Sequence, residues 1–254
     1  PNDGVMWDNG TVIPLGTLGG TLCHPYDINA LQQIVGTSDQ KNNGEYLAFI
    51  WQNGTMVPLP GLGGTFAGAH AISDQGIAVG FAAPGPFGRR AVKWVNGKVI
   101  PLSSLGGGLS SAQDINESGW IVGDAWTSPQ AGTTAALWIG EQGLDLTRRS
   151  LLQPGDRLYD ARGVNESGQI VGEGFFVDGS PGLPGGTFLG YMLTPLRLGD
   201  VDGDDAVNVD DLLAVINGWG ACPLPLSVAT CPADVNSDGV VNVDDLLRVI
   251  NDWG

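Results

Sequence analysis

Four tryptophans recur at a nearly constant spacing through most of the chain. Trp7, Trp51, Trp94 and Trp138 lie 44, 43 and 44 residues apart. The first three stand in closely related segments, VMWDNGTVIPLGTLGG (5–20), FIWQNGTMVPLPGLGG (49–64) and VKWVNGKVIPLSSLGG (92–107), and the fourth in the shorter LWIGEQGLDL (137–146). A fixed period of this length is typical of a repeat architecture, in which each unit packs on the next.

A second motif alternates with the tryptophan segments. It appears as DINALQQIVG (27–36), AISDQGIAVG (71–80), DINESGWIVG (114–123) and GVNESGQIVG (163–172). Asn-Gly and Asn-Glu-Ser-Gly between apolar runs are hairpin turn chemistry, and no helical apolar period is present. The pattern predicts a mainly β fold over residues 1–197, a propeller-like array of about four to five four-stranded blades. Each tryptophan is expected to be buried between neighbouring blades.

Composition agrees with a turn-rich β protein and excludes two classes of partner. The 254 residues include 41 glycines and 8 tryptophans, and only 15% are charged. The formal net charge is −16 and there is no basic patch, which argues against nucleic-acid binding. No apolar run approaches membrane-spanning length, so we expect no membrane span.

The two alternating motifs resemble the HAF-type extracellular repeat over almost all of residues 4–196. The resemblance implies a secreted β-repeat domain without established catalytic residues. The array begins with a tryptophan hairpin and ends with a single strand at 188–196, which leaves two arrangements open. Either the first hairpin completes the last blade and closes a ring, or the open edge pairs with a neighbouring molecule.

The C-terminal region contains one acidic twelve-residue loop written twice. The copies are DVDGDDAVNVDD (200–211) and DVNSDGVVNVDD (234–245), each followed by an apolar helical pattern. Oxygen side chains at loop positions 1, 3, 5, 9 and 12, with the backbone carbonyl at position 7, form the ligand spacing of an EF-hand-like Ca²⁺ loop. The sequence predicts two Ca²⁺ ions, with ligands Asp200, Asp202, Asp204, Ala206, Asn208 and Asp211, and Asp234, Asn236, Asp238, Val240, Asn242 and Asp245.

The pair of loops closely resembles a type I dockerin module over residues 198–254. The resemblance implies a small helical module, calcium-dependent folding and docking onto a cohesin-like partner. Loop positions 10 and 11 are the partner-reading positions of that family. They correspond here to Val209 and Asp210, and to Val243 and Asp244, so both copies present the same Val-Asp pair.

Three cysteines divide into a pair and a single residue. Cys222 and Cys231 bracket a Pro-rich loop between the two helical motifs, which predicts a disulfide. Cys23 is expected to be a small buried apolar residue. The chain does not begin with Met and shows no signal peptide, as expected of a mature exported product. Together with the calcium loops, the disulfide favours an extracellular location, secreted or at the cell surface.

Catalytic motifs are not found in the sequence. Gly-x-Ser-x-Gly, His-Glu-x-x-His and phosphate-loop patterns are absent, and the acidic residues of the β-repeat occupy repeated turn positions rather than distinct environments. We therefore expect a non-catalytic protein. Two sets of residues are candidates for other roles: a polar ligand ring of Tyr26, His70, Gln113 and Arg162, and glycosylation acceptors Asn9, Asn53, Asn116 and Asn165.

The sequence therefore predicts a calcium-binding protein that acts in attachment or assembly, with the β-repeat domain as a binding or packing surface. One alternative is a polysaccharide-degrading or sugar-binding component joined to its dockerin-like module. Another is a self-assembling filament or matrix subunit that binds neighbouring copies of itself. The amino-acid pattern leaves all three open.

Overall fold

The computed structural model describes residues 4–41, 44–86, 88–130, 132–150, 152–177, 186–194, 201, 208–222, 231–235 and 240–251. The chain forms two compact units, Pro1–Leu193 and Thr194–Gly254. No helix in the described ranges has the length and apolar character needed to span a bilayer.

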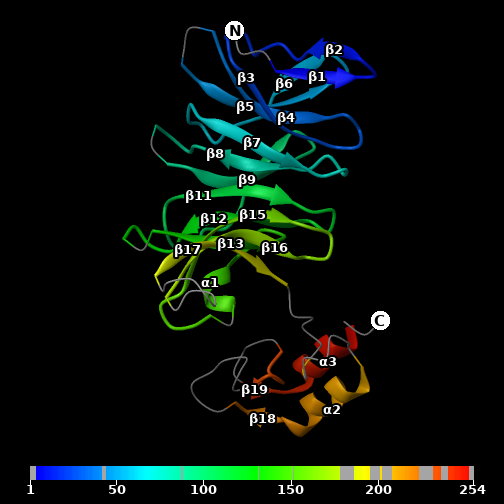
Figure 1. Ribbon diagram of the computed structural model, residues 1–254, viewed down its shortest axis with the longest axis vertical. Helices are drawn as coiled ribbons and strands as arrows, with labels where there is room; N and C mark the ends of the chain where they lie inside the picture. Colours follow the sequence, from blue (N-terminus) through cyan, green and yellow to red (C-terminus); the bar gives the residue numbers. More distant parts are fainter. Residues whose placement is uncertain are drawn as a thin grey trace. The chain divides into compact units, whose positions relative to one another are not determined.

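The first unit is mainly β and contains three four-stranded antiparallel sheets (Figure 1). Sheet A consists of β3 (Cys23–Ile28), β4 (Ile34–Asp39), β5 (Tyr46–Gln52) and β6 (Thr55–Pro58). Sheet B consists of β7 (Ala67–Ile72), β8 (Ala78–Ala82), β9 (Arg90–Val95) and β10 (Lys98–Pro101). Sheet C consists of β11 (Ser110–Ile115), β12 (Trp120–Trp126), β13 (Thr133–Ile139) and β14 (Gln142–Asp145). In each sheet the strands lie in chain order, so these three repeats have the four strands that the sequence predicts.

The two ends of the unit are smaller. The first hairpin, β1 (Val5–Asp8) and β2 (Thr11–Pro14), forms a two-stranded sheet of its own. Sheet D has three strands, β15 (Arg157–Val164), β16 (Ile170–Phe176) and β17 (Thr187–Leu193). A single helical turn, α1 (Leu146–Arg149), joins sheets C and D, and the Asp145 side chain caps it by accepting from the backbone N–H of Thr147.

The tryptophan hairpins are closed by Asn-Gly turns. Asn9, Asn53 and Asn96 have φ angles of 46°, 51° and 50°, and the glycine after each also has a positive φ. Positive φ at both central residues defines the two-residue turn whose twist matches that of paired strands. Glycine and asparagine tolerate this backbone region better than other residues, which is why this dipeptide recurs at the turn.

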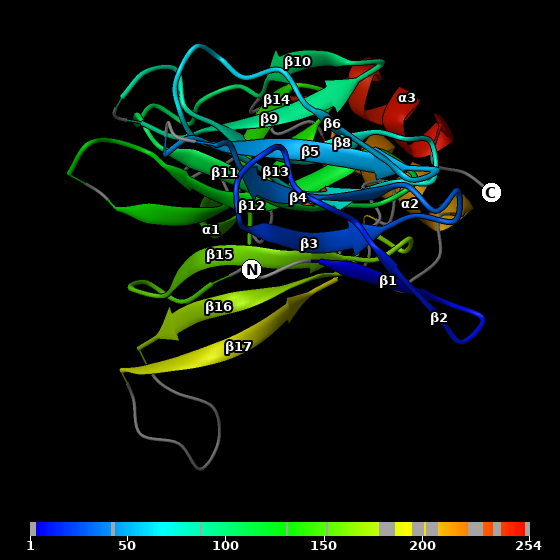
Figure 2. The same cartoon turned by 90° about the horizontal axis from the view of Figure 1, so that it is seen from above.

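Sheets A to D pack face to face in chain order, and Figure 2 shows sheets A to C lying over one another. Each sheet alternates the direction of its side chains, so one strand supplies apolar residues to two interfaces. Val35 of sheet A packs in one cluster with Trp94 of sheet B, and Val79 of sheet B packs in one cluster with Trp138 of sheet C.

Three of the four tryptophans are buried as predicted. Trp51, Trp94 and Trp138 lie between consecutive layers, and the indole Nε1 of Trp94 donates at 2.8 Å to the carbonyl of Pro60, which follows the last strand of sheet A. The prediction is wrong for Trp7, whose side chain is 71% exposed. No described sheet covers the face of the first hairpin on which Trp7 lies, so the indole stays in solvent.

Repeated acidic side chains also join the sheets. The Asp27 carboxylate accepts from the backbone N–H of Ile72 at 2.7 Å, and Asp114 accepts from that of Val164 at 2.8 Å. Both bonds cross from one sheet to the next. The acids are thus acceptors for buried backbone donors, which would otherwise lose their hydrogen bonds on folding.

A second series of bonds connects the turns of the Asn-containing hairpins. Ala30 N–H donates to Asp74, Asp74 N–H donates to Glu117, and Glu117 N–H donates to Glu166, at 2.7, 2.6 and 3.1 Å. Each turn is therefore bonded to the acid at the same position of the following turn. This ladder fixes the register between layers and explains why acidic residues recur there.

Of the two arrangements that the sequence left open, completion of the last blade by the first hairpin does not occur in the described chain. β17 takes the place beside β16, with Ile170 opposite Leu193 in the register that Ile34 and Trp51 have in sheet A. The first hairpin instead packs Met6 and Ile13 against sheet A, at the other end of the stack (Figure 1). The layers therefore form an open stack and not a closed ring, because the later strand fills the position that closure needs.

Candidate calcium module and docking surface

Two helices and a short sheet form the described part of the second unit. These elements are α2 (Val209–Asn217), α3 (Val243–Asn251), and a two-stranded pairing of β18 (Gly220–Ala221) with β19 (Val240–Val241). The core brings together residues from equivalent positions of the two loop-helix copies, namely Val201 and Val235, Leu212 and Leu246, and Val215 and Val249. The repeated sequence therefore folds into a repeated packing arrangement.

Position 9 of each loop is an N-cap. The Asn208 side chain accepts from Asp210 N–H, and the Asn242 side chain accepts from Asp244 N–H, both at 2.7 Å. Asparagine is a preferred N-cap because its side-chain oxygen satisfies a helix donor that has no intrahelical partner. The same oxygen has a second lone pair, so capping does not prevent it from serving a bound ion or its water.

Position 12 of each loop is a fully buried aspartate. Asp211 accepts from the backbone N–H of Asn208 at 2.8 Å, which completes a capping box at α2. Asp245 accepts from the backbone N–H of Asn242 at 2.9 Å, which is the equivalent bond at α3. Asp211 also accepts from Val201 N–H. Each carboxylate thus ties the start of a helix to its own loop.

The described ligand candidates fit a calcium ion in type. They are the carboxylates of Asp211, Asp234 and Asp245, the side chains of Asn208 and Asn242, and the carbonyl of Val240. All offer hard oxygen atoms, which Ca²⁺ prefers, and the three carboxylates are buried. The remaining predicted ligands, Asp200, Asp202, Asp204, Ala206, Asn236 and Asp238, lie outside the described residues.

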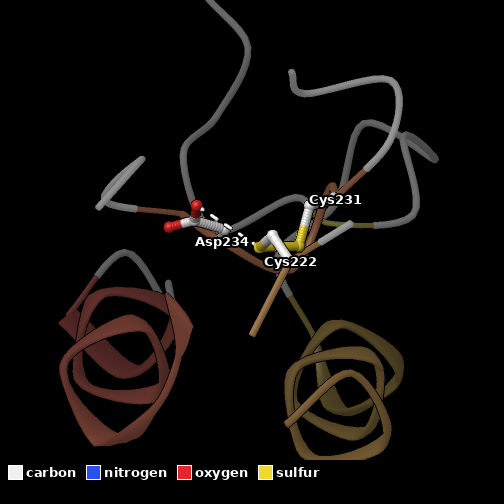
Figure 3. Close-up of side chains that lie close together, drawn as sticks. All are labelled: Cys222, Cys231 and Asp234. Carbon is white, nitrogen blue, oxygen red and sulfur yellow. Dashed lines mark hydrogen bonds between the residues drawn. A yellow bond between two sulfur atoms is a disulfide. The ribbon is translucent and has the colours of Figure 1, made fainter. Parts of the chain in front are cut away.

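The predicted disulfide between Cys222 and Cys231 is confirmed, with the two Cα atoms 5.7 Å apart. Figure 3 shows that it lies against Asp234, position 1 of the second loop, whose Oδ2 is 3.5 Å from the Cys222 sulfur. The only sign of this contact in the sequence is that Cys231 precedes Asp234 by three positions. The three side chains do not form a metal site of their own, because oxidised sulfur offers no thiolate. Cys23 is buried in the first unit, as expected.

An apolar stripe on each helix faces solvent. On α2 it consists of Val209, Leu213 and Ile216, and on α3 of the equivalent Val243, Leu247 and Ile250. The two stripes match closely in exposure, for example 54% at Val209 and 53% at Val243. Residues at these spacings share one side of a helix. The module therefore presents the same apolar surface twice.

Residues 198–253 match the family model of the dockerin type I domain. The C-terminal unit is a dockerin module. Dockerin type I domains bind calcium and cohesins, and the dockerin contains the loops, caps and duplicated helices described above. No curated protein and no solved structure was found to match the chain. The resemblance of residues 4–196 to HAF-type repeats stays a prediction.

The four candidate ligand-ring residues share a feature that the sequence did not reveal. Tyr26, His70, Gln113 and Arg162 each lie at an irregularity in the pairing of the first strand of their sheet. Such a bulge leaves one residue unpaired and redirects its side chain. No sequence signal marked the bulges, since the strands contain no glycine at that position.

The structure brings only part of this set together. The rings of Tyr26 and His70 meet edge to face, with centroids 5.6 Å apart, and His70 Nδ1 lies 2.8 Å from the Ala112 carbonyl. Burial lowers the pKa of His70, and the positive charge of Arg89 lowers it further. The neutral imidazole therefore donates from Nδ1, because a carbonyl only accepts.

The other two members bind carboxylates. Gln113 donates to Asp124 at 3.4 Å, and Arg162 pairs with Asp160 at 2.9 Å. In an open stack the four positions follow one another along the layers and do not surround an axis. A ligand ring stays a prediction, and each of its members already has a partner within the chain.

The four glycosylation candidates differ in accessibility. Asn9, Asn53 and Asn165 are exposed, whereas Asn116 is buried and its amide nitrogen donates to the Asn165 carbonyl at 2.9 Å. Asn116 is thus committed to an inter-sheet bond, and its amide is not accessible for modification.

Proposed function

We propose that this chain is an extracellular, non-catalytic protein that acts in attachment or assembly by docking its calcium-loaded dockerin on a cohesin-like partner. Two Ca²⁺ ions hold the two loops, and the stripes on α2 and α3 form the docking surface together with Val209, Asp210, Val243 and Asp244. The β-repeat unit serves as a binding or packing surface.

The observation that carries this proposal is the duplicated apolar stripe. Helices that belong to a small module usually bury their apolar residues, and exposed patches of this kind mark interaction sites. Here Leu213 and Leu247 are each about half exposed beside a helix start that is tied to a loop. Because the stripes are equivalent, the dockerin has two alternative surfaces for one partner.

The absence of catalysis is supported by the roles of the repeated acids. Asp27, Asp114, Glu117 and Glu166 accept backbone N–H groups across sheet interfaces. Paired carboxylates that act in glycoside hydrolysis differ in environment and face a substrate cleft. Structural use of these acids favours a β-repeat unit without hydrolytic activity.

Binding to a panel of type I cohesin domains tests the proposal. We expect saturable binding in calcium that is lost in chelator, with Leu213→Asp and Leu247→Asp each retaining most of the affinity and the double variant losing it. Ile139→Asp, an exposed apolar position in the β-repeat unit, is the control and should bind normally. No binding to any cohesin, or full binding by the double variant, would contradict the docking role.

A further inference from the structure

The open stack of sheets exposes large apolar side chains on the outer face at each end, and the outer face of sheet D also presents Glu173, which pairs with Arg162. We call the face of a sheet that receives the next sheet its downstream face and the opposite one its upstream face. The downstream face of sheet D presents Val171, Phe188 and Met192, and the upstream face of the first hairpin presents Trp7 and Val12. Trp7, Phe188 and Met192 are among the most exposed large apolar side chains in the described chain.

The internal interfaces show what covers a downstream face. Val35, Val79 and Val122 occupy the same position in sheets A, B and C, and all three are fully buried beneath the next sheet. In two of these interfaces the covering sheet supplies a tryptophan, Trp94 over the Val35 layer and Trp138 over the Val79 layer. The fold thus repeats one arrangement, a valine-bearing strand under a tryptophan hairpin.

The chain leaves one member of this arrangement unmatched at each end. Val171 has the valine position in sheet D, with Met192 opposite it as Ile50 is opposite Val35, yet Val171 is 46% exposed. Trp7 has the tryptophan position in the first hairpin and is also exposed. The two surfaces lie at opposite ends of the first unit (Figure 1), so they do not meet within one chain.

We propose that the 254-residue chain associates head to tail, with the downstream face of sheet D in one copy covering the Trp7 face of the first hairpin in a second copy. The occupant of each face is the kind of surface that covers its equivalent at two interfaces within the fold, Trp94 over the Val35 layer and Trp138 over the Val79 layer. This interface is separate from the dockerin and does not depend on the docking function.

Such an interface is heterologous, because it joins two different patches. Each added copy leaves one patch free at either end, so association continues into short chains unless geometry closes a ring. The interfaces between sheets of one chain are also stabilised by hydrogen bonds that acidic side chains of one layer accept from the next layer. Gly163 of sheet D stands where Asp27 and Asp114 have a carboxylate, so the junction gains fewer cross-layer hydrogen bonds and is expected to be reversible.

The charge of the protein gives the association a defined salt dependence. Copies with a formal charge of −16 repel one another, and added salt screens that repulsion while leaving apolar contacts intact. Association through the end faces should therefore strengthen with salt. It should also persist in chelator, since the β-repeat unit provides both faces.

Concentration-dependent mass by analytical ultracentrifugation tests the proposal on the full chain, with and without calcium. We expect the average mass to rise with concentration, and Val171→Asp to weaken association at least about tenfold by placing a charge in a buried face. Ile139→Asp is the matched control, because Ile139 is 45% exposed but belongs to sheet C, away from both ends. Circular dichroism checks that each variant is folded.

A mixing experiment distinguishes head-to-tail from symmetric association. Val171→Asp blocks one face and Trp7→Asp the other, so each variant alone should be monomeric, while an equimolar mixture should form dimers and nothing larger. A monomeric wild type, an association that Val171→Asp and Trp7→Asp leave unchanged, or one that chelator abolishes would overturn the proposal. Failure of the mixture to dimerise would overturn its head-to-tail form.

Discussion

At the scale of single residues, the β-repeat unit depends on side chains that accept hydrogen bonds between layers. Asp27 and Asp114 each accept a backbone N–H from the following sheet, and sheet B has Ala71 at the same position. The pKa of Asp114 is raised by burial, although the N–H groups of Val164 and Ile115 oppose that rise. A half-buried acid that accepts from two backbone donors is a structural element of the interface.

We expect Asp114→Ala to destabilise the β-repeat unit by about 1–3 kcal/mol, because the buried N–H of Val164 loses its acceptor. Asp74→Ala is the matched control, since Asp74 also accepts from a neighbouring turn but at an exposed position, and its removal should cost less than about 1 kcal/mol. Urea unfolding followed by circular dichroism measures both. Equal losses for the two variants would contradict the role assigned to burial.

His70 makes stability depend on pH in a defined direction. Its pKa in the folded protein lies below 6.5, so the unfolded chain takes up the proton first and stability falls as the pH drops through about 6.5. We expect His70→Gln to flatten this dependence below about pH 6.5, by up to about 1.4 kcal/mol per pH unit. Gln113 occupies the equivalent position in sheet C, so the replacement suits the site. Melting temperatures across this range test it, and an unchanged slope would contradict burial of the neutral form.

At the scale of elements, two features of strand pairing shape the first unit. β17 pairs with β16 and takes the third place in sheet D, which prevents the first hairpin from completing that sheet. The bulges at Tyr26, His70, Gln113 and Arg162 turn one side chain out of each first strand. Both depend on the register in which consecutive strands pair, and no turn motif in the sequence marks either of them.

The disulfide is the element that supports the second calcium loop. Closing a loop of about ten residues stabilises a fold by about 2–3 kcal/mol in chain-entropy terms, and Cys231 lies three residues before Asp234. We expect the Cys222→Ser/Cys231→Ser double variant to lose at least about tenfold in affinity at one calcium site and little at the other. Isothermal titration calorimetry with Ca²⁺ resolves the two sites. A uniform loss at both sites, or none, would contradict the local role of the disulfide.

At the scale of the whole molecule, the chain is two units with different sources of stability. Residues 1–198 include 16 acidic and 10 basic residues around apolar interfaces, whereas residues 199–254 include 11 acidic residues and one basic residue around a small core. The dockerin therefore carries a formal charge of −10. Carboxylates that repel one another need a counter-charge, and calcium supplies it.

We expect chelation to lower the melting transition of the dockerin and to leave that of the β-repeat unit unchanged. At free calcium one hundred times the dissociation constant, each site adds about 2.7 kcal/mol, and this contribution is lost in chelator. Differential scanning calorimetry with and without EDTA measures the two transitions. A single transition that does not respond to calcium would contradict the assignment of metal-dependent folding.

The amino-acid sequence alone determined the features that depend on short-range chemistry. Asn-Gly turns, the four-strand repeat, the helices after the acidic loops and the Cys222–Cys231 pair were predictable, because each rests on residues within a few positions of one another or on a strict period. Only the tertiary structure decided that the stack stays open and that Trp7 is exposed while Trp51, Trp94 and Trp138 are buried. A repeated motif determines which side chains each layer presents. Whether those side chains are buried depends on whether another layer covers them, and no layer of the described chain covers the outer face of the first hairpin or of sheet D.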